Sequence, residues 1–137
     1  MKKAFRTTFV MALAALLWAC SGETDTNSPK HIVEQYAEAI IKGDYRGALD
    51  LVYFGGETEE AQQLREAFTN LCEEMAKEGL KESDQLVRYQ LGEEEIDEAK
   101  GKAIVQATLT YADEHSKEDE IHLLRDEQGQ WLVDETN

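Results

Sequence analysis

The sequence predicts an α+β fold in which three helices precede a four-stranded antiparallel sheet. Two observations support this prediction. Apolar residues recur with a helical period of about 3.6 residues as far as Gly79, and afterwards they alternate with a period of two. Short polar segments separate the alternating stretches of the second half, so we expect consecutive strands to pair as a meander.

The first predicted helix has clear signals at both ends. Ser28 stands in the N-cap position, Pro29 follows at the first helical position, and Gly43 ends the helix. Between them the apolar side chains fall on one face. These are Ile32, Val33, Tyr36, Ala37, Ile40 and Ile41.

Two further helices are expected before Gly79. Asp44 can cap a short helix over residues 45–54, which the glycine pair at 55 and 56 ends. A longer helix is expected from about residue 58 to 77, with glutamates in its first turn that suit the positive end of the helix dipole. Its apolar stripe consists of Leu64, Phe68, Leu71, Cys72 and Met75. We expect the Cys72 thiol to behave as a small buried hydrophobic group, with Glu73 and Glu74 making it less reactive.

Four strands are predicted after Gly79. They cover residues 85–91, 101–112, 120–126 and 130–135, and the second has the clearest alternation. The acidic runs at 92–98 and 117–120 are interpreted as solvated surface, and the segment 113–119 as a polar loop. Gly129 supplies the turn before the last strand.

The N-terminus has the features of a secretory signal peptide over residues 1–19. Cationic residues precede an apolar run at 9–19, which is too short to span a bilayer as a helix. The following "LWAC" at 17–20 resembles the lipobox of bacterial lipoproteins. This resemblance implies that Cys20 is acylated, with fatty acids such as palmitate, and becomes the mature N-terminus. The alternative is an ordinary secreted protein with a chance cysteine.

Removal of the signal leaves 118 of the 137 residues, enough for one modest core. We expect residues 20–28 to form a flexible acidic tether that carries the lipidated Cys20, and residues 29–137 to form a single domain. The formal charge changes from −15 to −18 because three cations leave with the signal. Such a surface repels nucleic acid, so a nucleic-acid partner is not expected.

No pattern of catalytic or metal-binding residues stands out. The three histidines are far apart in sequence and none has a neighbour at metal-ligand spacing. Nucleophile elbows, phosphate-binding glycine loops and calcium-loop spacing are also absent from the sequence. We therefore predict no metal, no cofactor and no catalytic residue.

Three stretches, at 36–52, 101–114 and 120–135, resemble the nuclear-transport-factor-two-like superfamily, which has a cystatin-like α+β fold. The resemblance implies a cone in which a curved sheet wraps around the helices and leaves a pocket. Within this superfamily the sequence is most similar to small envelope lipoprotein domains of unknown function, described as lumazine-binding-like.

The ketosteroid isomerases of the same superfamily offer an enzyme comparison. Tyr36 lies eight residues before Asp44, as the oxyanion-binding tyrosine does in that family. The general base of the family has no good counterpart, because glycines occupy its region and only Glu57 is near. An isomerase- or dehydratase-type enzyme is therefore the last-ranked interpretation.

The sequence thus predicts a non-enzymatic lipoprotein of the bacterial cell envelope. We expect acyl chains to hold it in a membrane, the outer membrane by preference, at its periplasmic or surface face. Its function would be to bind a small apolar ligand in the cone pocket. The alternative is a protein-interaction or assembly module that forms a homodimer through its sheet face. The candidate pocket residues, which could instead simply fill the core, are Tyr36, Ile40, Tyr53, Phe68, Val105, Leu109 and Trp131.

Overall fold

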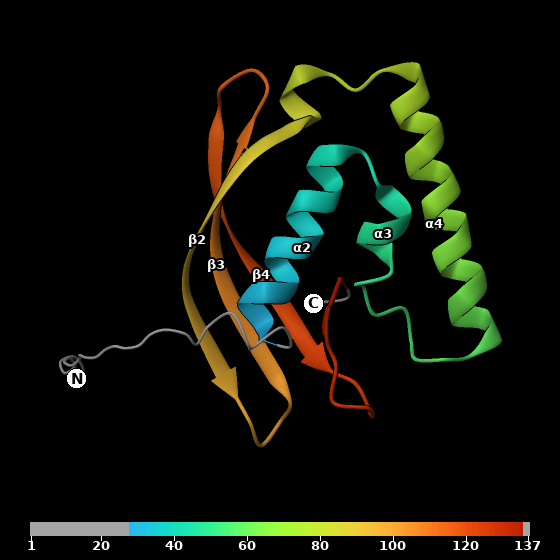
Figure 1. Ribbon diagram of the computed structural model, residues 1–137, viewed down its shortest axis with the longest axis vertical. Coiled ribbons are helices and arrows are strands. Elements are labelled where there is room, and N and C mark those ends of the chain that lie inside the picture. Colours follow the sequence, from blue (N-terminus) through green and yellow to red (C-terminus); the bar gives the residue numbers. More distant parts are fainter. Residues whose placement is uncertain (1–27, 136–137) are drawn as a thin grey trace, which may run out of the picture.

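The computed structural model describes residues 28–135, so the predicted signal, Cys20 and nearly all of the tether lie outside the described residues. The described chain forms three α-helices, a short 3-10 turn and four strands (Figure 1). In chain order these are α2 (Pro29–Lys42), α3 (Tyr45–Leu49), α4 (Glu59–Glu78), η3 (Glu82–Asp84), β2 (Leu86–Asp97), β3 (Lys102–Tyr111), β4 (Ser116–Arg125) and β5 (Trp131–Val133). The strands pair antiparallel in the order β2-β3-β4-β5, which confirms the predicted α+β meander.

The sheet is curved, and α2 lies in its hollow (Figure 1). Irregularities in the pairing of β2 with β3, between Leu86 and Arg88 and between Leu91 and Glu94, accompany the curvature. Because α2 packs on β2, β3 and β5, this helix and the concave face of the sheet enclose the core. The curved sheet around a helix agrees with the expected cone.

The predicted caps at Ser28, Gly43 and Asp44 are confirmed. The Ser28 hydroxyl oxygen accepts a hydrogen bond from the backbone N–H of His31 at 3.1 Å, and Gly43 closes α2 with a positive φ of 83°. The Asp44 carboxylate likewise accepts from the N–H of Gly47 at 3.0 Å and opens α3. Thr58 caps α4 through the N–H of Ala61 at 3.0 Å.

The prediction that the second helix reaches residue 54 is wrong. It ends at Leu49, because the following residues pair with the last strand instead. The N–H of Tyr53 donates to the Val133 carbonyl at 2.8 Å, and the N–H of Val133 donates to the Leu51 carbonyl at 2.7 Å. This short parallel bridge, centred on Val52 and Val133, ties the helical half of the chain to the sheet.

Two strands are longer than predicted, both at acidic segments. β2 continues through the run at 92–97, and β4 begins at Ser116 inside the predicted loop. A tight turn with Glu114 at a φ of 73° makes this early start possible. The acidic residues are nevertheless mostly exposed, as a solvated surface requires.

The buried core lies between α2 and the sheet. Its members come from α2, the bridge segment and three strands. They are Ile32, Val33, Val52, Ala103, Val105, Leu123, Trp131 and Val133. Among residues 28–135, no helix has both the length and the hydrophobicity needed to cross a bilayer.

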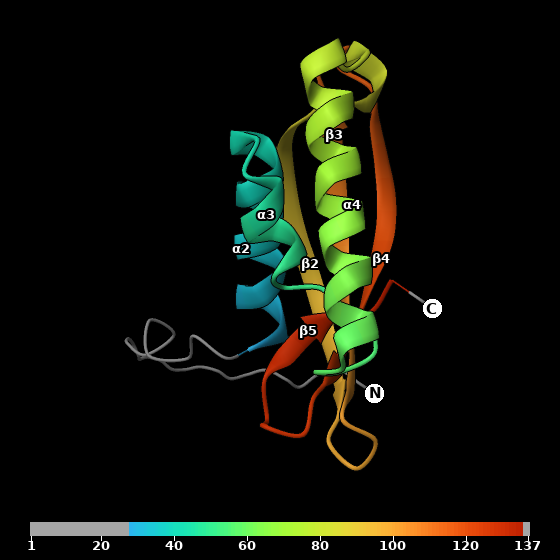
Figure 2. The ribbon, with the colours of Figure 1, turned by 90° about the vertical axis from the view of Figure 1, so that its right-hand side faces the viewer.

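The helix α4 stands apart from this core. It packs mainly on α3 and lies farther from the sheet than α2 does (Figure 1). In the view turned by 90°, α4 lies in front of the strands (Figure 2). Its buried residues are Ala61 and Thr69, and Cys72 is half-buried. The expectation that its apolar stripe packs inward is wrong for the large side chains. Leu64, Phe68, Leu71 and Met75 are 45%, 44%, 54% and 49% exposed.

Candidate ligand-binding cavity

A cavity of about 260 Å³ lies between α2 and the concave face of the sheet. Aliphatic side chains and tyrosines from α2, β2, β3 and β4 make most of its wall. The aliphatic ones are Val33, Ala37 and Ile40 on α2, with Leu86, Leu91, Leu109 and Ile121 on the strands. Three tyrosines, Tyr36, Tyr89 and Tyr111, and three carboxylates, Asp84, Asp119 and Glu135, complete it.

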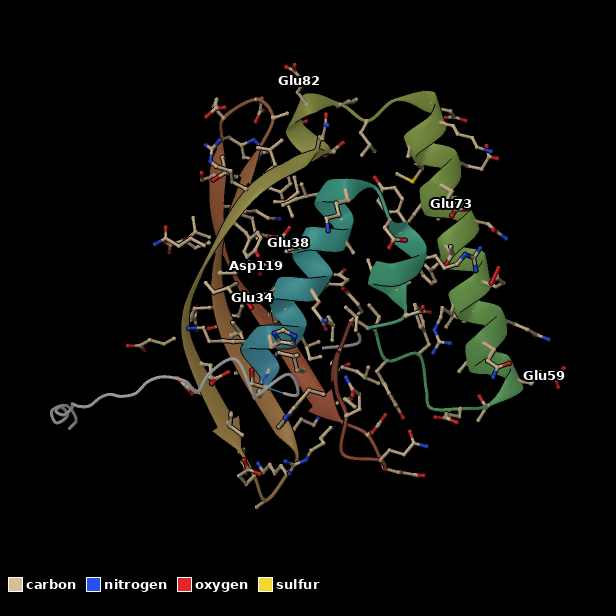
Figure 3. All side chains as sticks on the ribbon, in the orientation of Figure 1. Glu34, Glu38, Glu59, Glu73, Glu82 and Asp119 are labelled. Carbon is tan, nitrogen blue, oxygen red and sulfur yellow. The ribbon has the colours of Figure 1, made fainter. Side chains whose placement is uncertain are left out.

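Strand register explains why these sheet residues share the concave face. Leu91 lies opposite Ala107, which lies opposite Asp119 on the next strand. Residues directly opposite one another in an antiparallel pair point to the same face. Because Asp119 is two residues before Ile121, both β4 side chains point toward α2. Asp119 is labelled in Figure 3.

Tyr36 projects from α2 into this cavity and contacts the segment after β5. Its hydroxyl donates a hydrogen bond to Glu135 Oε2 at 3.1 Å. Burial, and then the neighbouring Glu135 carboxylate, raise the pKa of Tyr36 well above its usual value. Cys72 is also near enough to contribute to this pKa shift. The phenol therefore remains protonated, as a hydrogen-bond donor, across the physiological pH range.

Tyr89 makes a similar connection from the sheet back to α2. Its hydroxyl donates to Glu38 Oε2 at 2.8 Å. Burial, followed by the hydrogen bond and the charge of Glu38, raises the pKa of Tyr89 to about 12. The labelled Glu34 and Glu38 mark the face of α2 from which this negative charge comes (Figure 3).

The structure brings three of the seven sequence-predicted pocket residues together. Tyr36, Ile40 and Leu109 all line the cavity. Val105 and Trp131 are instead part of the buried core, where the ring of Trp131 also lies 4.9 Å from the Arg125 guanidinium.

The remaining two candidates lie elsewhere. Tyr53 lines a separate surface hollow that loop residues form near the bridge segment. Phe68 is exposed on α4, where its ring centroid is 5.7 Å from that of Phe54. Tyr53 lies outside the cavity because the segment after α3 forms a bridge to β5. Phe68 lies outside it because α4 packs on α3 rather than on the sheet.

The sequence analysis missed the acidic members of the cavity, Asp84, Asp119 and Glu135. Asp119 belongs to the acidic run at 117–120, for which the sequence predicts solvated surface, whereas β4 already begins at Ser116. A signal was present, since Asp119 and Ile121 share the period-two alternation that was used for the strand itself. No local pattern predicts the position of Glu135, which depends on the path of the chain after β5.

Two other hollows are larger than this cavity. One of about 750 Å³ is bordered by loop residues and by charges of both signs, including Arg65, Lys100 and Asp126. Another of about 510 Å³ lies between the C-terminal ends of α2 and α4. Both are formed at the margins of the fold. The 260 Å³ cavity is open to solvent as well, but it lies between a helix and the concave face of the sheet, where a rigid frame and mainly apolar walls favour ligand binding.

The chemistry available in the cavity is limited. Its described lining includes no serine, threonine, cysteine, histidine or lysine that could serve as a nucleophile. Within residues 28–135, no three His, Cys, Asp or Glu side chains are grouped so as to hold a metal ion. Cys72 lies outside the lining, and burial, together with Glu73, raises the pKa of its thiol.

Comparison with known proteins supports the fold. The structure is similar to the 2.00 Å crystal structure of a Campylobacter jejuni protein named "Putative NTF2-like transpeptidase". The TM-score is 0.55 at 15% sequence identity, and the match covers 78% of this chain and 98% of that one. At this identity the likeness shows a shared fold. No model of a protein family matches the sequence. No curated protein matches it either.

Proposed function

We propose that this protein binds a small ligand with a mainly apolar body in the cavity between α2 and the sheet, without transforming it. The observation that carries the proposal is the cavity wall, in which aliphatic residues and tyrosines surround the space and a few carboxylates stand at its margin. Apolar walls with a few placed polar groups are typical of small-molecule sites. The NTF2-like fold of the structural neighbour often forms such a pocket.

Several features argue against an enzyme. The name of the structural neighbour suggests transpeptidation, which in this chain would need an activated hydroxyl or thiol nucleophile, and the described cavity lining includes no serine, threonine or cysteine. Isomerase-type chemistry would use Tyr36 beside a general base. However, the Tyr36 hydroxyl already donates its hydrogen bond to Glu135, and Glu57 lines the surface hollow near Tyr53 instead. The other two carboxylates of the cavity, Asp84 and Asp119, are exposed at its margin.

We further propose that acyl chains on Cys20 tether this domain to a membrane of the bacterial cell envelope. The proposal depends on the lipobox-like residues 17–20 and on the polar, acidic segment that separates Cys20 from α2. Expression in a bacterium with an alkyne analogue of palmitate should label the wild-type chain and leave the Cys20→Ser variant unlabelled. Equal labelling of both chains would contradict this part of the proposal.

A second candidate function is self-association, because α4 exposes Leu64, Phe68, Leu71 and Met75 along one side. The second copy would cover this stripe rather than the sheet face that the sequence analysis favoured. Sedimentation of the protein over a concentration series, with Leu71→Glu as the disrupting variant, tests this function. A monomer at all concentrations would exclude it.

Native mass spectrometry tests the principal proposal. Residues 21–137, which include the whole core, are incubated with a cell-envelope extract and compared with a Leu109→Trp variant that fills the cavity. Thr108→Trp is the matched control, because Thr108 lies on the opposite face of the same strand. We expect a small bound mass on the wild type and on the control but not on Leu109→Trp. No bound mass, or the same mass on all three proteins, would contradict the proposal.

A further inference from the structure

We infer that the cavity between α2 and the sheet takes an organic cation, an amine or quaternary ammonium with a small apolar body. This inference rests on the proposed function and names the chemical class of its ligand. It follows from the cavity itself, whose apolar walls select the body of the ligand, and from the charged groups at its margin, which select the sign of the ligand's charge.

The carboxylates of the cavity come from three separate parts of the fold. Asp84 belongs to η3, Asp119 to β4 and Glu135 to the segment after β5. All three residues are exposed, so their carboxylates are solvated at the margin while the aliphatic wall lies between α2 and the sheet. A ligand in this cavity therefore meets negative charge from several directions, beside an apolar surface.

The described lining provides no compensating positive charge, since it includes no lysine, arginine or histidine. The lysine that strand register places beside it is Lys117, opposite Leu109, and it is exposed and outside the lining. A ligand carboxylate or phosphate would be repelled by this arrangement, whereas an ammonium group would be attracted. The net charge of −15 for the whole chain adds to the same preference.

Two tyrosine rings in the wall, those of Tyr36 and Tyr89, favour a cation in a second way, whereas the third, Tyr111, is already stacked on His115 with ring centroids 4.8 Å apart. Ring faces of tyrosine attract ammonium groups, with a strength of about 0.5–1 kcal/mol at exposed sites. Tyr36 and Tyr89 donate their hydroxyl protons to Glu135 and Glu38, so neither phenol is free to donate to an anionic ligand. Their raised pKa values keep both phenols neutral while their carboxylate partners remain nearby.

An inorganic cation fits this cavity less well than an organic one. Metal ions such as Ca²⁺ take six to eight oxygen ligands in proteins, whereas most of this wall is aliphatic or aromatic carbon. The described residues also include no cluster of metal-ligating side chains. The combination of carbon walls and marginal carboxylates matches a molecule that is itself part apolar and part positively charged.

Calorimetric titration of residues 21–137 with three probes of similar shape tests the inference. Phenethylamine is cationic, phenethyl alcohol is neutral and phenylacetate is anionic at pH 7. We expect the amine to bind most tightly and phenylacetate most weakly, with an affinity for the amine that falls as salt is added. Leu109→Trp should abolish the binding of all probes, and Thr108→Trp should not.

Charge-neutralising variants then test which carboxylates cause the preference for the amine over the alcohol. Asp119→Asn should weaken amine binding about two- to fivefold, the range expected for a solvent-exposed charge pair, and leave alcohol binding unchanged. Adding Glu135→Gln should weaken amine binding further. Glu118→Gln is the matched control, because it removes the same charge from the other face of β4.

The possible results separate the two proposals. If the alcohol binds as tightly as the amine and Leu109→Trp abolishes both, the cavity binds ligands but the inference of a cationic ligand is wrong. If an anion binds most tightly, the inference is likewise overturned. If none of the probes binds, or if Leu109→Trp binds them as the wild type does, both the inference and the proposed function are contradicted.

Discussion

The two longest helices of this protein have similar sequence patterns and different surroundings. Both α2 and α4 begin at a hydroxyl cap and both have apolar side chains at helical spacing. α2 buries Ile32 and Val33 against the concave sheet, whereas α4 buries only Ala61 and Thr69 and exposes its large apolar residues. The comparison teaches that helical periodicity identifies an amphipathic face, while the partner of that face depends on the rest of the fold.

This difference has a consequence for ligand binding. A cavity keeps its shape only if its walls are held by the core, and the α2 side of the molecule meets that condition. The α4 side has few buried apolar contacts, which is a property of regions that open locally at low free-energy cost. We therefore propose that the ligand binds on the α2 side of the molecule.

The largest expected effect is on global stability. Leu123, on the concave face of β4, is 1% exposed, and Leu123→Ala should lower the free energy of unfolding by about 2–5 kcal/mol. Leu71 on α4 is 54% exposed, so the free energy of unfolding of Leu71→Ala should differ from that of the wild type by no more than about 0.5 kcal/mol. Urea unfolding of the two variants measures both values. Similar losses from both substitutions would show that α4 is as well packed as the core between α2 and the sheet.

A pH-dependent effect is expected from Tyr36. Its pKa is raised in the folded protein by burial and by Glu135, so the native state retains a proton that the unfolded chain loses above about pH 10. This contribution to stability is complete below pH 10 and is lost as the pH rises further, by at most about 1.4 kcal/mol per pH unit. Tyr36→Phe should therefore show a shallower decline in unfolding free energy between pH 10 and pH 11.

Tyr89→Phe provides the comparison for this pH series, because the pKa of Tyr89 is also raised, to about 12. Tyr89→Phe should also make the decline in unfolding free energy between pH 10 and pH 11 shallower. An unchanged alkaline slope in Tyr36→Phe would contradict the account of Tyr36 as a buried donor to Glu135.

Substitutions at the two helix caps should distinguish local opening of α4 from unfolding of the whole domain. Ser28→Ala and Thr58→Ala each remove a side-chain acceptor at a helix N-terminus, at a cost of about 1 kcal/mol. Because α2 is part of the core, Ser28→Ala should reduce the global stability. Thr58→Ala should mainly accelerate hydrogen exchange of amides in α4, with a smaller effect on the sheet. Equal acceleration in α4 and β3 would mean that α4 opens only with the whole domain.

The smallest expected effect concerns Cys72. Burial, and then Glu73, raise the pKa of its thiol, so less thiolate forms near neutral pH than in a free cysteine. A thiol reagent should therefore modify Cys72 more slowly at pH 7.5 than it modifies a short unstructured peptide with the same local sequence. Glu73→Gln should increase the rate modestly, and Glu78→Gln, farther along the helix, serves as the control. A rate faster than that of the peptide would contradict the assignment.

Much of the fold could be predicted from local sequence signals. The caps at Ser28 and Asp44, the stop at Gly43 and the alternation in β3 depend on short-range physics, and the structure confirms them. The end of α3 could not be predicted in this way, because Val52 leaves the helical path to pair with Val133, more than 80 residues later. Long-range pairing overrode local helix propensity at this position.

The residues of the candidate site were harder to predict from the sequence than the fold was. Tyr36, Ile40 and Leu109 were found because each belongs to the apolar face of a correctly predicted element. Asp119 and Glu135 were not, since their place in the cavity depends on strand register and on the path of the C-terminus. Phe68 was misplaced because its helix packs on α3, a choice that periodicity alone does not determine.

The α2 side of the molecule, and not the α4 side, is the proposed place of ligand binding. Amide chemical-shift mapping of residues 21–137, during titration with whichever of the three probes binds most tightly, distinguishes the two sides. We predict saturable shifts that cluster at Ala37, Leu91 and Ile121, around the cavity. The largest shifts at Leu71 and Met75 on α4, or no saturable shift at the cavity, would contradict the account.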